Sequence, residues 1–205
     1  MLREFASRPY ALDLVNNPPR HVVREIEAAL GFWQLPPPPA TVLEMGSGTG
    51  RLTKPLLERG YRVLACDPDA RAQQGLRDLQ AGDRLEVFGS VEAVPTGEPI
   101  AAVVGVDILH HARPEDILAL ARTRLPPGGV AGFDEPDGAH AGWWAFVTLT
   151  GRLTNELGLA RATKTKLMRR LDEAGFAEPR AMRWAPSWRG KLGPRWFYAA
   201  RKGGV

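Results

Sequence analysis

Short apolar runs alternate with amphipathic stretches through most of the first 136 residues, and this alternation limits the possible folds more than any other feature. Strands are expected at the apolar runs, which cover residues 40–45, 61–67, 84–89, 100–109 and 128–136. Helices are expected before and between them, at residues 20–33, 51–60, 69–82 and 114–125. Strands and helices that alternate at this pace form βαβ units, so the chain should fold into a parallel sheet with helices on both faces.

The pattern changes after residue 137. Residues 140–153 contain two Trp, one Phe and almost no charge. An amphipathic helix is expected at residues 163–176, and two last strands are expected at residues 177–184 and 195–202. A loop rich in Pro, Gly, Trp and Arg separates these two strands.

Charge is spread unevenly along the chain, which has a net charge of +4. Residues 1–160 carry 15 Lys or Arg against 20 Asp or Glu, whereas residues 161–205 carry 12 against 3. A basic end of this kind can attract nucleic acid, an anionic lipid or an anionic substrate. A solvated basic surface fits the same pattern, so composition alone leaves the partner open.

Cysteine usage and hydropathy favour a cytoplasmic protein. Cys66 is the only cysteine, which excludes an intramolecular disulfide, and a small apolar core residue is the expected role. No apolar run approaches the roughly 20 residues that span a bilayer. The first ten residues, MLREFASRPY, lack the apolar core of a signal peptide. No transmembrane segment is therefore expected. No metal site is expected either.

A glycine loop follows the first expected strand, in the stretch LEMGSGTGR at residues 43–51. Glycines at such a place let the backbone approach a ligand closely. Gly46 and Gly48 match the first two positions of the dinucleotide fingerprint G-x-G-x-x-G, but Arg51 stands where its third glycine belongs and Gly50 precedes it. This spacing argues against a dinucleotide and favours S-adenosylmethionine.

An acidic residue, Asp67, ends the next expected strand, 21 residues after Gly46. A carboxylate at this place can accept hydrogen bonds from both ribose hydroxyls of a nucleotide cofactor. NAD and S-adenosylmethionine would each use it. Asp67 therefore supports a nucleoside site, whereas the loop spacing discriminates between the two cofactors.

Five segments in order resemble the class I S-adenosylmethionine-dependent methyltransferases, especially the small-molecule group that includes the quinone-biosynthesis enzymes. The segments are VLEMGSGTG, VLACDPD, VFGSVEAVP, VDILHHARPED and LPPGGVAGFDEP. The resemblance implies an α/β, Rossmann-like, doubly wound sheet that is mostly parallel with an antiparallel last strand, in the order 3-2-1-4-5-7-6. It also implies a single domain over residues 1–205, with an N-terminal helical cap or lid at 1–39, a cofactor-binding core at 40–137, and a substrate-side insert with the last strands at 138–205.

The same resemblance implies S-adenosylmethionine as the cofactor and places residues around it. They are Glu44, Gly46, Ser47, Gly48 and Gly50 at the methionine end, Asp67 at the ribose, Pro68, Ser90 and Val91 at the adenine, and the backbone of Asp107 beside the amino-acid moiety. Two positions depart from the family pattern, since Ser90 and Ala101 stand where the family often has an acid.

Catalytic and substrate-side candidates cluster after the fourth and fifth strands. His110 and His111 follow the fourth strand, and a histidine there can act as a base for a hydroxyl nucleophile or can cap the strand end. Candidates after the fifth strand, each of which also fits a loop or capping role, are Asp134, Glu135, Asp137 and His140. The aromatic candidates for a substrate cavity, a membrane-surface contact or ordinary packing are Trp143, Trp144 and Phe146, and Tyr10 is a candidate for an N-terminal lid.

Three functions follow from these observations. The leading hypothesis is a methyltransferase that acts on a small, apolar or aromatic molecule such as a quinone precursor, phenol, lipid or secondary metabolite. An RNA methyltransferase is the main alternative, which the basic carboxyl-terminal region favours. A non-catalytic subunit that binds the cofactor is the third, and the sequence leaves the oligomeric state open.

Overall fold

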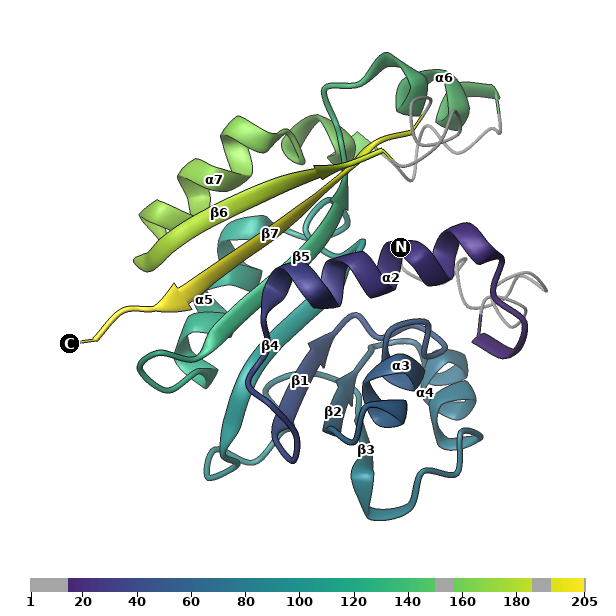
Figure 1. Ribbon diagram of the computed structural model, residues 1–205, viewed down its shortest axis with the longest axis vertical. Coiled ribbons are helices and arrows are strands. Elements are labelled where there is room, and N and C mark those ends of the chain that lie inside the picture. The colour runs from purple at the N-terminus through teal and green to yellow at the C-terminus, as the bar shows by residue number, and fades with distance from the viewer. Residues whose placement is uncertain (1–14, 150–156, 186–192, 205) are drawn as a thin grey trace.

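The computed structural model describes residues 15–149, 157–185 and 193–204 (Figure 1). Its helices are α2 (Arg20–Trp33), α3 (Thr53–Glu58), α4 (Ala70–Arg77), α5 (Pro114–Arg124), α6 (Ala141–Leu149) and α7 (Lys164–Glu173), with short 3-10 helices η1 (Gly82–Arg84) and η2 (Leu157–Arg161). Its strands are β1 (Thr41–Met45), β2 (Arg62–Cys66), β3 (Leu85–Phe88), β4 (Ile100–Val106), β5 (Val130–Pro136), β6 (Phe176–Trp184) and β7 (Arg195–Lys202).

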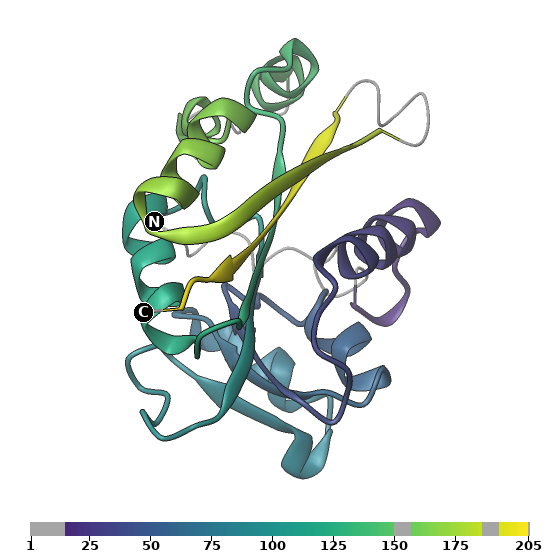
Figure 2. The ribbon, with the colours of Figure 1, turned by 60° about the vertical axis from the view of Figure 1, so that its left-hand side comes forward.

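The seven strands form one sheet in the order β3-β2-β1-β4-β5-β7-β6. Strands β1 to β5 pair in parallel, whereas β7 runs antiparallel to both β5 and β6. The predicted Rossmann-like fold, including its strand order and antiparallel last strand, is confirmed. Figure 2 shows the sheet twisting from the short β3 edge to the long β6–β7 pair.

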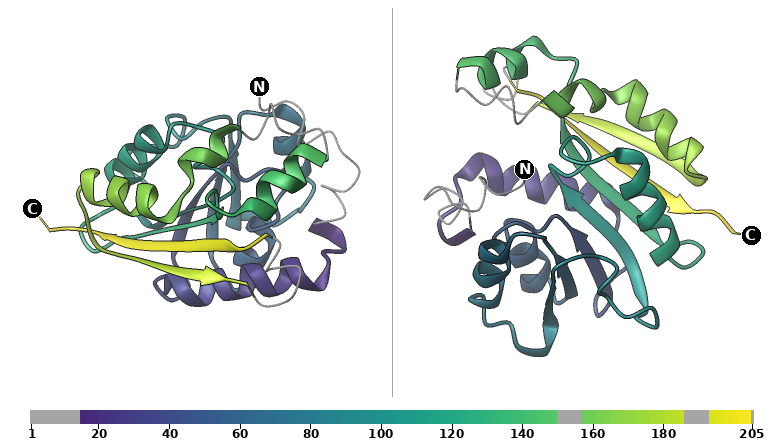
Figure 3. Two further views of the ribbon diagram at one scale, coloured as in Figure 1. Left: turned by 90° about the horizontal axis from the view of Figure 1, so that it is seen from above. Right: turned by 180° about the vertical axis from the view of Figure 1, so that it is seen from behind.

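Helices cover both faces of the sheet, and each face has its own apolar core. Seen from above, α2 and the α5–α7 side lie on opposite sides of the strands (Figure 3). One core joins α2, α3 and α4 to the sheet, and the other joins α5 and α7 to it. Burial on both faces explains why the central strands are almost continuously apolar in sequence.

Helix α2 docks through a stripe of residues at helical spacing, which are Val22, Ile26, Ala29, Leu30 and Trp33. The Trp33 ring packs against β5 at Gly132. A Cβ atom on Gly132 would approach Trp33 Cγ to 2.7 Å, so the close contact between helix and strand requires glycine there. This contact fixes α2 across the sheet beside β5 and β7.

Several expected elements are shorter than the sequence pattern indicates. The strand expected at 100–109 ends at Val106, because Asp107 adopts a left-handed conformation with φ of 58°. The helix expected at 69–82 ends at Arg77, and positive φ values at Gln80 and Gly82 prevent its continuation. The helix expected at 51–60 covers Thr53–Glu58 only.

Two further expectations concern the aromatic segment 140–153 and the absence of a membrane-spanning helix. The aromatic segment 140–153 forms a helix over its first part, α6, and its last residues lie outside the described ranges. Among the residues that the structure describes, no helix combines the length and hydropathy needed to cross a membrane.

Candidate functional site

The glycine loop lies between β1 and α3, at the carboxyl end of β1. Gly46, Gly48 and Gly50 have φ values of 69°, 54° and 109°, which only glycine adopts without strain. A Cβ atom on Gly46 would lie 2.7 Å from Ile108 Cδ1, whereas one on Gly48 would meet nothing within 4 Å. The loop is therefore packed against Ile108 at Gly46. It is open at Gly48, where a ligand can approach the backbone.

Hydrogen bonds join the loop to the end of β2. The amides of Gly46 and Ser47 donate to the Cys66 carbonyl at 2.8 and 3.1 Å, and the Ser47 hydroxyl donates to the same oxygen at 3.1 Å. The loop backbone is thus held before any ligand arrives. Cys66 itself is a buried core residue, and burial raises the pKa of its thiol to about 12.

The glycine loop orients the side chain of Asp67, which follows β2. Its Oδ2 accepts the Gly48 amide at 2.8 Å and its Oδ1 accepts the Asp69 amide at 2.9 Å. Burial raises the pKa of Asp67, although these two hydrogen bonds oppose the rise. Each carboxylate oxygen can accept a further hydrogen bond, so the fixed carboxylate is well suited to a diol such as a ribose.

The adenine-side candidates lie beside Asp67. The Asp67 amide donates to the Phe88 carbonyl at 3.1 Å, which brings the ends of β2 and β3 together. Pro68 and Ser90 are exposed, whereas the side chain of Val91 packs in the core. The structure therefore gathers these residues at one edge of the sheet.

Glu44 lies beneath the loop. It is 2% exposed, and the Thr53 hydroxyl donates to its Oε2 at 2.6 Å. Burial raises the pKa of Glu44 to about 8, against the opposing effect of that hydrogen bond. The Glu44 side chain thus supports the loop from the interior of the domain.

Asp107 is clamped between two guanidinium groups. Arg51 Nη2 donates to its Oδ2 and Arg195 Nη2 donates to its Oδ1, each at 2.7 Å. Burial raises the pKa of Asp107, but Arg195 and Arg51 outweigh this effect and hold it well below its usual range. The clamp stabilises the left-handed backbone of Asp107 and so positions Ile108 under the glycine loop.

Two more carboxylates complete this cluster, which we call the Arg195 network. Arg195 Nε donates to Asp134 Oδ1 at 2.6 Å and lies 3.2 Å from Glu25 Oε1. The side chains of Arg195, Asp134 and Glu25 are 7%, 0% and 14% exposed. Five charged residues from α2, the glycine loop and the ends of β4, β5 and β7 therefore meet at the carboxyl edge of the sheet.

His110 and Glu135 form a second buried pair, on the other face of the sheet. His110 Nδ1 lies 2.6 Å from Glu135 Oε2, and both side chains are almost fully buried. Glu135 Oε1 accepts the amides of Ile108 and Leu109 at 2.9 and 2.7 Å. The ring of His111 lies 4.0 Å from that of His110, centroid to centroid. Glu135 therefore orients His110, the first of the two expected histidines.

The 3-10 helix η2 covers this pair from above. A Cβ atom on Gly158 would lie 1.6 Å from the His110 carbonyl oxygen, and one on Gly138 would lie 1.8 Å from that of Leu159. Glycine at both positions allows the backbones to touch. The segment after residue 156 is therefore packed directly onto the ends of β4 and β5.

Helix α6 projects from the same edge and carries the aromatic candidates (Figure 1). The indole of Trp143 donates to the Pro194 carbonyl at 2.7 Å, and that of Trp144 donates to the Gly138 carbonyl at 3.0 Å. His140 Nδ1 accepts the Gly142 amide at 3.1 Å, as a helix cap does. Phe146 is 45% exposed. Tyr10 lies outside the described residues.

Sequence reasoning missed two of the five residues of the Arg195 network, Glu25 and Arg195, and did not place the other three together. The sequence distinguishes Arg51 only as the residue that replaces the third glycine of the dinucleotide fingerprint. Neither Glu25 nor Arg195 lies in a recognisable motif. Glu25 is one of several charged residues on α2, and Arg195 opens the last strand. The sequence could have indicated Arg195 only through its place at the start of a strand that pairs with β5.

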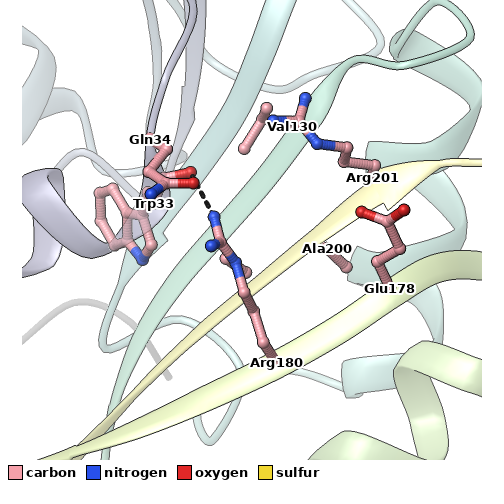
Figure 4. Close-up of a pocket in the computed structure, with 8 residues that line it drawn as sticks. Trp33, Gln34, Val130, Glu178, Arg180, Ala200 and Arg201 are labelled. Atoms are coloured by element: carbon pink, nitrogen blue, oxygen red, sulfur yellow. Dashed lines mark hydrogen bonds between the residues drawn. The ribbon is translucent and has the colours of Figure 1, made fainter.

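A small pocket of about 130 Å³ lies away from these residues, between the end of α2 and the sheet. Figure 4 shows Arg180 reaching from β6 toward the carbonyl of Trp33, with a separation of 3.4 Å. Val130 begins β5 and Arg201 lies near the end of β7. The pocket therefore lies at the edge opposite the glycine loop.

Comparisons with known proteins agree with this geometry. A family model described as a methyltransferase domain matches residues 17–189. An uncharacterized methyltransferase of Geobacillus kaustophilus (strain HTA426) is 37% identical over 92 residues, which cover 43% of this chain and 43% of the relative. The match thus spans less than half of that relative's length.

Solved structures share the fold over most of the chain. Geranyl diphosphate methyltransferase in complex with SAM superposes with a TM-score of 0.69 at 15% identity, covering 96% of this chain and 93% of the other. The 1,6-didemethyltoxoflavin-N1-methyltransferase of Burkholderia thailandensis gives a TM-score of 0.64 at 19% identity, covering 90% and 79%. At this identity the similarity is one of fold.

Proposed function

The chain belongs to the methyltransferase-domain family, and on that premise we propose that it transfers a methyl group from S-adenosylmethionine to a small-molecule acceptor. The observation that carries the proposal is the hydrogen bond between the glycine loop and Asp67, the carboxylate expected to bind a ribose. The Gly48 amide fixes the Asp67 carboxylate at the edge of the sheet where open α/β folds bind ligands. This arrangement offers a backbone surface and a diol acceptor side by side.

In this proposal the cofactor lies across the carboxyl ends of β1, β2 and β4. Gly46, Ser47, Gly48 and Gly50 face its methionine end. Asp67 accepts its ribose hydroxyls, and Pro68, Ser90 and Val91 border its adenine. Two contacts support the loop. Glu44 accepts a hydrogen bond from Thr53 in the helix that follows the loop, and Asp107 pairs with Arg51 at the end of the loop. S-adenosylmethionine supplies an activated methyl group, so the protein has mainly to align the acceptor and exclude water.

His110 is the candidate general base. A carboxylate accepts hydrogen bonds and does not donate them, so Nδ1 donates to Glu135 and Nε2 is the nitrogen that takes up a proton. Fixing the tautomer in this way prepares an imidazole to deprotonate a hydroxyl acceptor during methyl transfer. His111 packs against the first ring and is the weaker candidate.

The acceptor side favours an apolar or aromatic molecule. Nine residues of α6 carry no charge, and Trp143, Trp144 and Phe146 lie on it near the carboxyl ends of the strands. The two structural neighbours described above are named for geranyl diphosphate and for 1,6-didemethyltoxoflavin. These acceptors belong to those proteins and support only the choice of a small molecule here.

Calorimetry and labelled transfer test the proposal. S-Adenosylmethionine should bind the protein and NAD should not, since Arg51 replaces the glycine that a dinucleotide loop uses. Label from methyl-labelled cofactor should then appear in a small-molecule or lipid extract rather than in a separate RNA extract. Binding of NAD alone would contradict the cofactor assignment. Label in RNA alone would favour the alternative that the basic carboxyl-terminal region supports.

Replacing His110 tests the base. His110→Ala should lower turnover by about 100-fold or more while cofactor affinity stays within a few-fold of the original. His21→Ala provides the matched control, because His21 is exposed on α2. Equal turnover in the two variants would remove His110 from the mechanism.

A further inference from the structure

The Arg195 network holds one more carboxylate than guanidinium. Glu25, Asp107 and Asp134 surround Arg51 and Arg195 within ion-pair distance. Asp134 is fully buried, and within the described part of the chain its Oδ2 has no hydrogen-bond partner. A buried carboxylate oxygen without a partner is costly unless the group holds a proton or a cation lies near it. Asp134 is therefore the group of the network at which a proton binds, and the network carries a surplus negative charge only when that proton is lost.

The network borders the glycine loop on two sides. Arg51 directly follows Gly50 in the chain, and Asp107 directly precedes Ile108, which packs beneath Gly46. The side chains of Arg51 and Asp107 are 24% and 31% exposed, whereas those of the inner residues are almost fully buried. The outer end of the network therefore opens beside the loop, and its charge acts on any ligand bound there.

We propose that the Arg195 network, through Asp134, selects the cationic cofactor over the product that remains after methyl transfer. This inference rests on the proposed function. S-Adenosylmethionine and S-adenosylhomocysteine differ by one methyl group and one positive charge at sulfur, and their remaining parts are the same. When Asp134 gives up its proton, the network gains a negative charge that stabilises the sulfonium and leaves the neutral thioether unaffected. The product is then released more readily than the cofactor.

Proton binding at Asp134 makes the selection depend on pH. Burial raises the pKa of Asp134 well above its ordinary value, despite the neighbouring Arg195. The charged and titratable groups that act on it are Arg195 and Tyr198 from β7, Glu25 from α2, Asp107 from the end of β4 and Arg51 from the glycine loop. A sulfonium nearby lowers the pKa of the carboxyl, so binding of S-adenosylmethionine releases a proton from Asp134 to solvent. Binding of S-adenosylhomocysteine does so much less, and the preference for the cation therefore grows as pH rises.

Calorimetric titration of both ligands at pH 6 and pH 8 tests the inference. The ratio of the two dissociation constants should favour S-adenosylmethionine more strongly at pH 8 in the unaltered protein. Asp134→Asn should reduce the pH dependence of this ratio and lower the preference at pH 8 by about tenfold, the order of magnitude that one charge contributes inside a protein. The α-amino group titrates in both ligands, so the ratio cancels its contribution.

Glu178→Gln is the matched control, because this exposed carboxylate on β6 lines the pocket at the opposite edge of the sheet. It should leave the ratio and its pH dependence unchanged. If Asp134→Asn fails to fold, Glu25→Gln removes one negative charge from the same network and should also lower the preference. An unchanged ratio in either network variant would overturn the inference, whereas failure of both ligands to bind the unaltered protein would overturn the proposed function instead.

Discussion

Asp67 uses one carboxylate both to hold the glycine loop and, in the proposed function, to bind the ribose. At the scale of single residues we therefore expect Asp67→Ala to weaken S-adenosylmethionine binding. Loss of buried hydrogen bonds costs about 1–3 kcal/mol, which corresponds to roughly 5- to 150-fold in the dissociation constant. Calorimetry measures this change, with Asp83→Ala on the exposed η1 turn as the control. An affinity equal to that of the control would refute the ribose role.

Glu44 gives a prediction on stability and pH. Its pKa is about 8 in the folded protein against 4.5 in the unfolded chain, since burial disfavours the charged form. Between these values the folded state holds a proton that the unfolded state has released, so the free energy of unfolding falls as pH rises from about 5 to 8. Glu44→Gln should remove this decline, which is on the order of 4 kcal/mol.

Urea denaturation at pH 5.5 and pH 8 measures the effect of Glu44→Gln. The Gln side chain can still accept the Thr53 hydroxyl, so the variant tests the charge and keeps the hydrogen bond. Glu86→Gln serves as the control, because Glu86 is a half-exposed partner of Arg62 on β3. Parallel pH profiles for Glu44→Gln and the unaltered protein would contradict the prediction.

At the scale of elements, strands and helices followed from the sequence and their ends did not. Val42, Val63 and Val103 lie in runs whose apolar character reflects burial on both faces, a property that the sequence shows directly. The end of β4 depends instead on the left-handed backbone of Asp107, which two distant arginines stabilise. No local pattern at residues 107–109 reports that clamp, so the expected strand ran three residues too long.

Docking of α2 on β5 gives a prediction at this scale. Gly132→Ala should push the Trp33 ring away from the strand, because the new Cβ would lie 2.7 Å from it. Overpacking of this kind costs about 1–3 kcal/mol in the free energy of unfolding. Gly31→Ala makes the same chemical change on the exposed side of α2, where nothing lies within 4 Å, and should instead stabilise the helix by about 0.5–1 kcal/mol. Denaturation that shows the same sign for both variants would refute this account of the docking.

At the scale of the whole molecule, the site divides into a part that is local in sequence and a part that is not. The glycine loop and Asp67 belong to successive βα units, so their spacing alone predicts that they meet. The Arg195 network joins residues 25 to 195 and forms only because β7 inserts between β5 and β6. The strand order is therefore needed to place Arg195 beside Asp134. Charge pairing between residues so far apart in sequence leaves no local pattern.

Binding of the cofactor should stabilise the whole domain, because its proposed contacts come from β1, β2 and β4, the centre of the single sheet. A ligand at 100 times its dissociation constant adds about 2.7 kcal/mol to the free energy of unfolding. For a chain of 205 residues this corresponds to a rise in melting temperature of about 5–10 °C. Differential scanning calorimetry should show the rise with S-adenosylmethionine, a smaller rise at the same concentration for Asp67→Ala, and none with NAD. A rise of equal size with NAD would mean that the loop accepts a dinucleotide, and with it the reason for assigning methyl transfer would be lost.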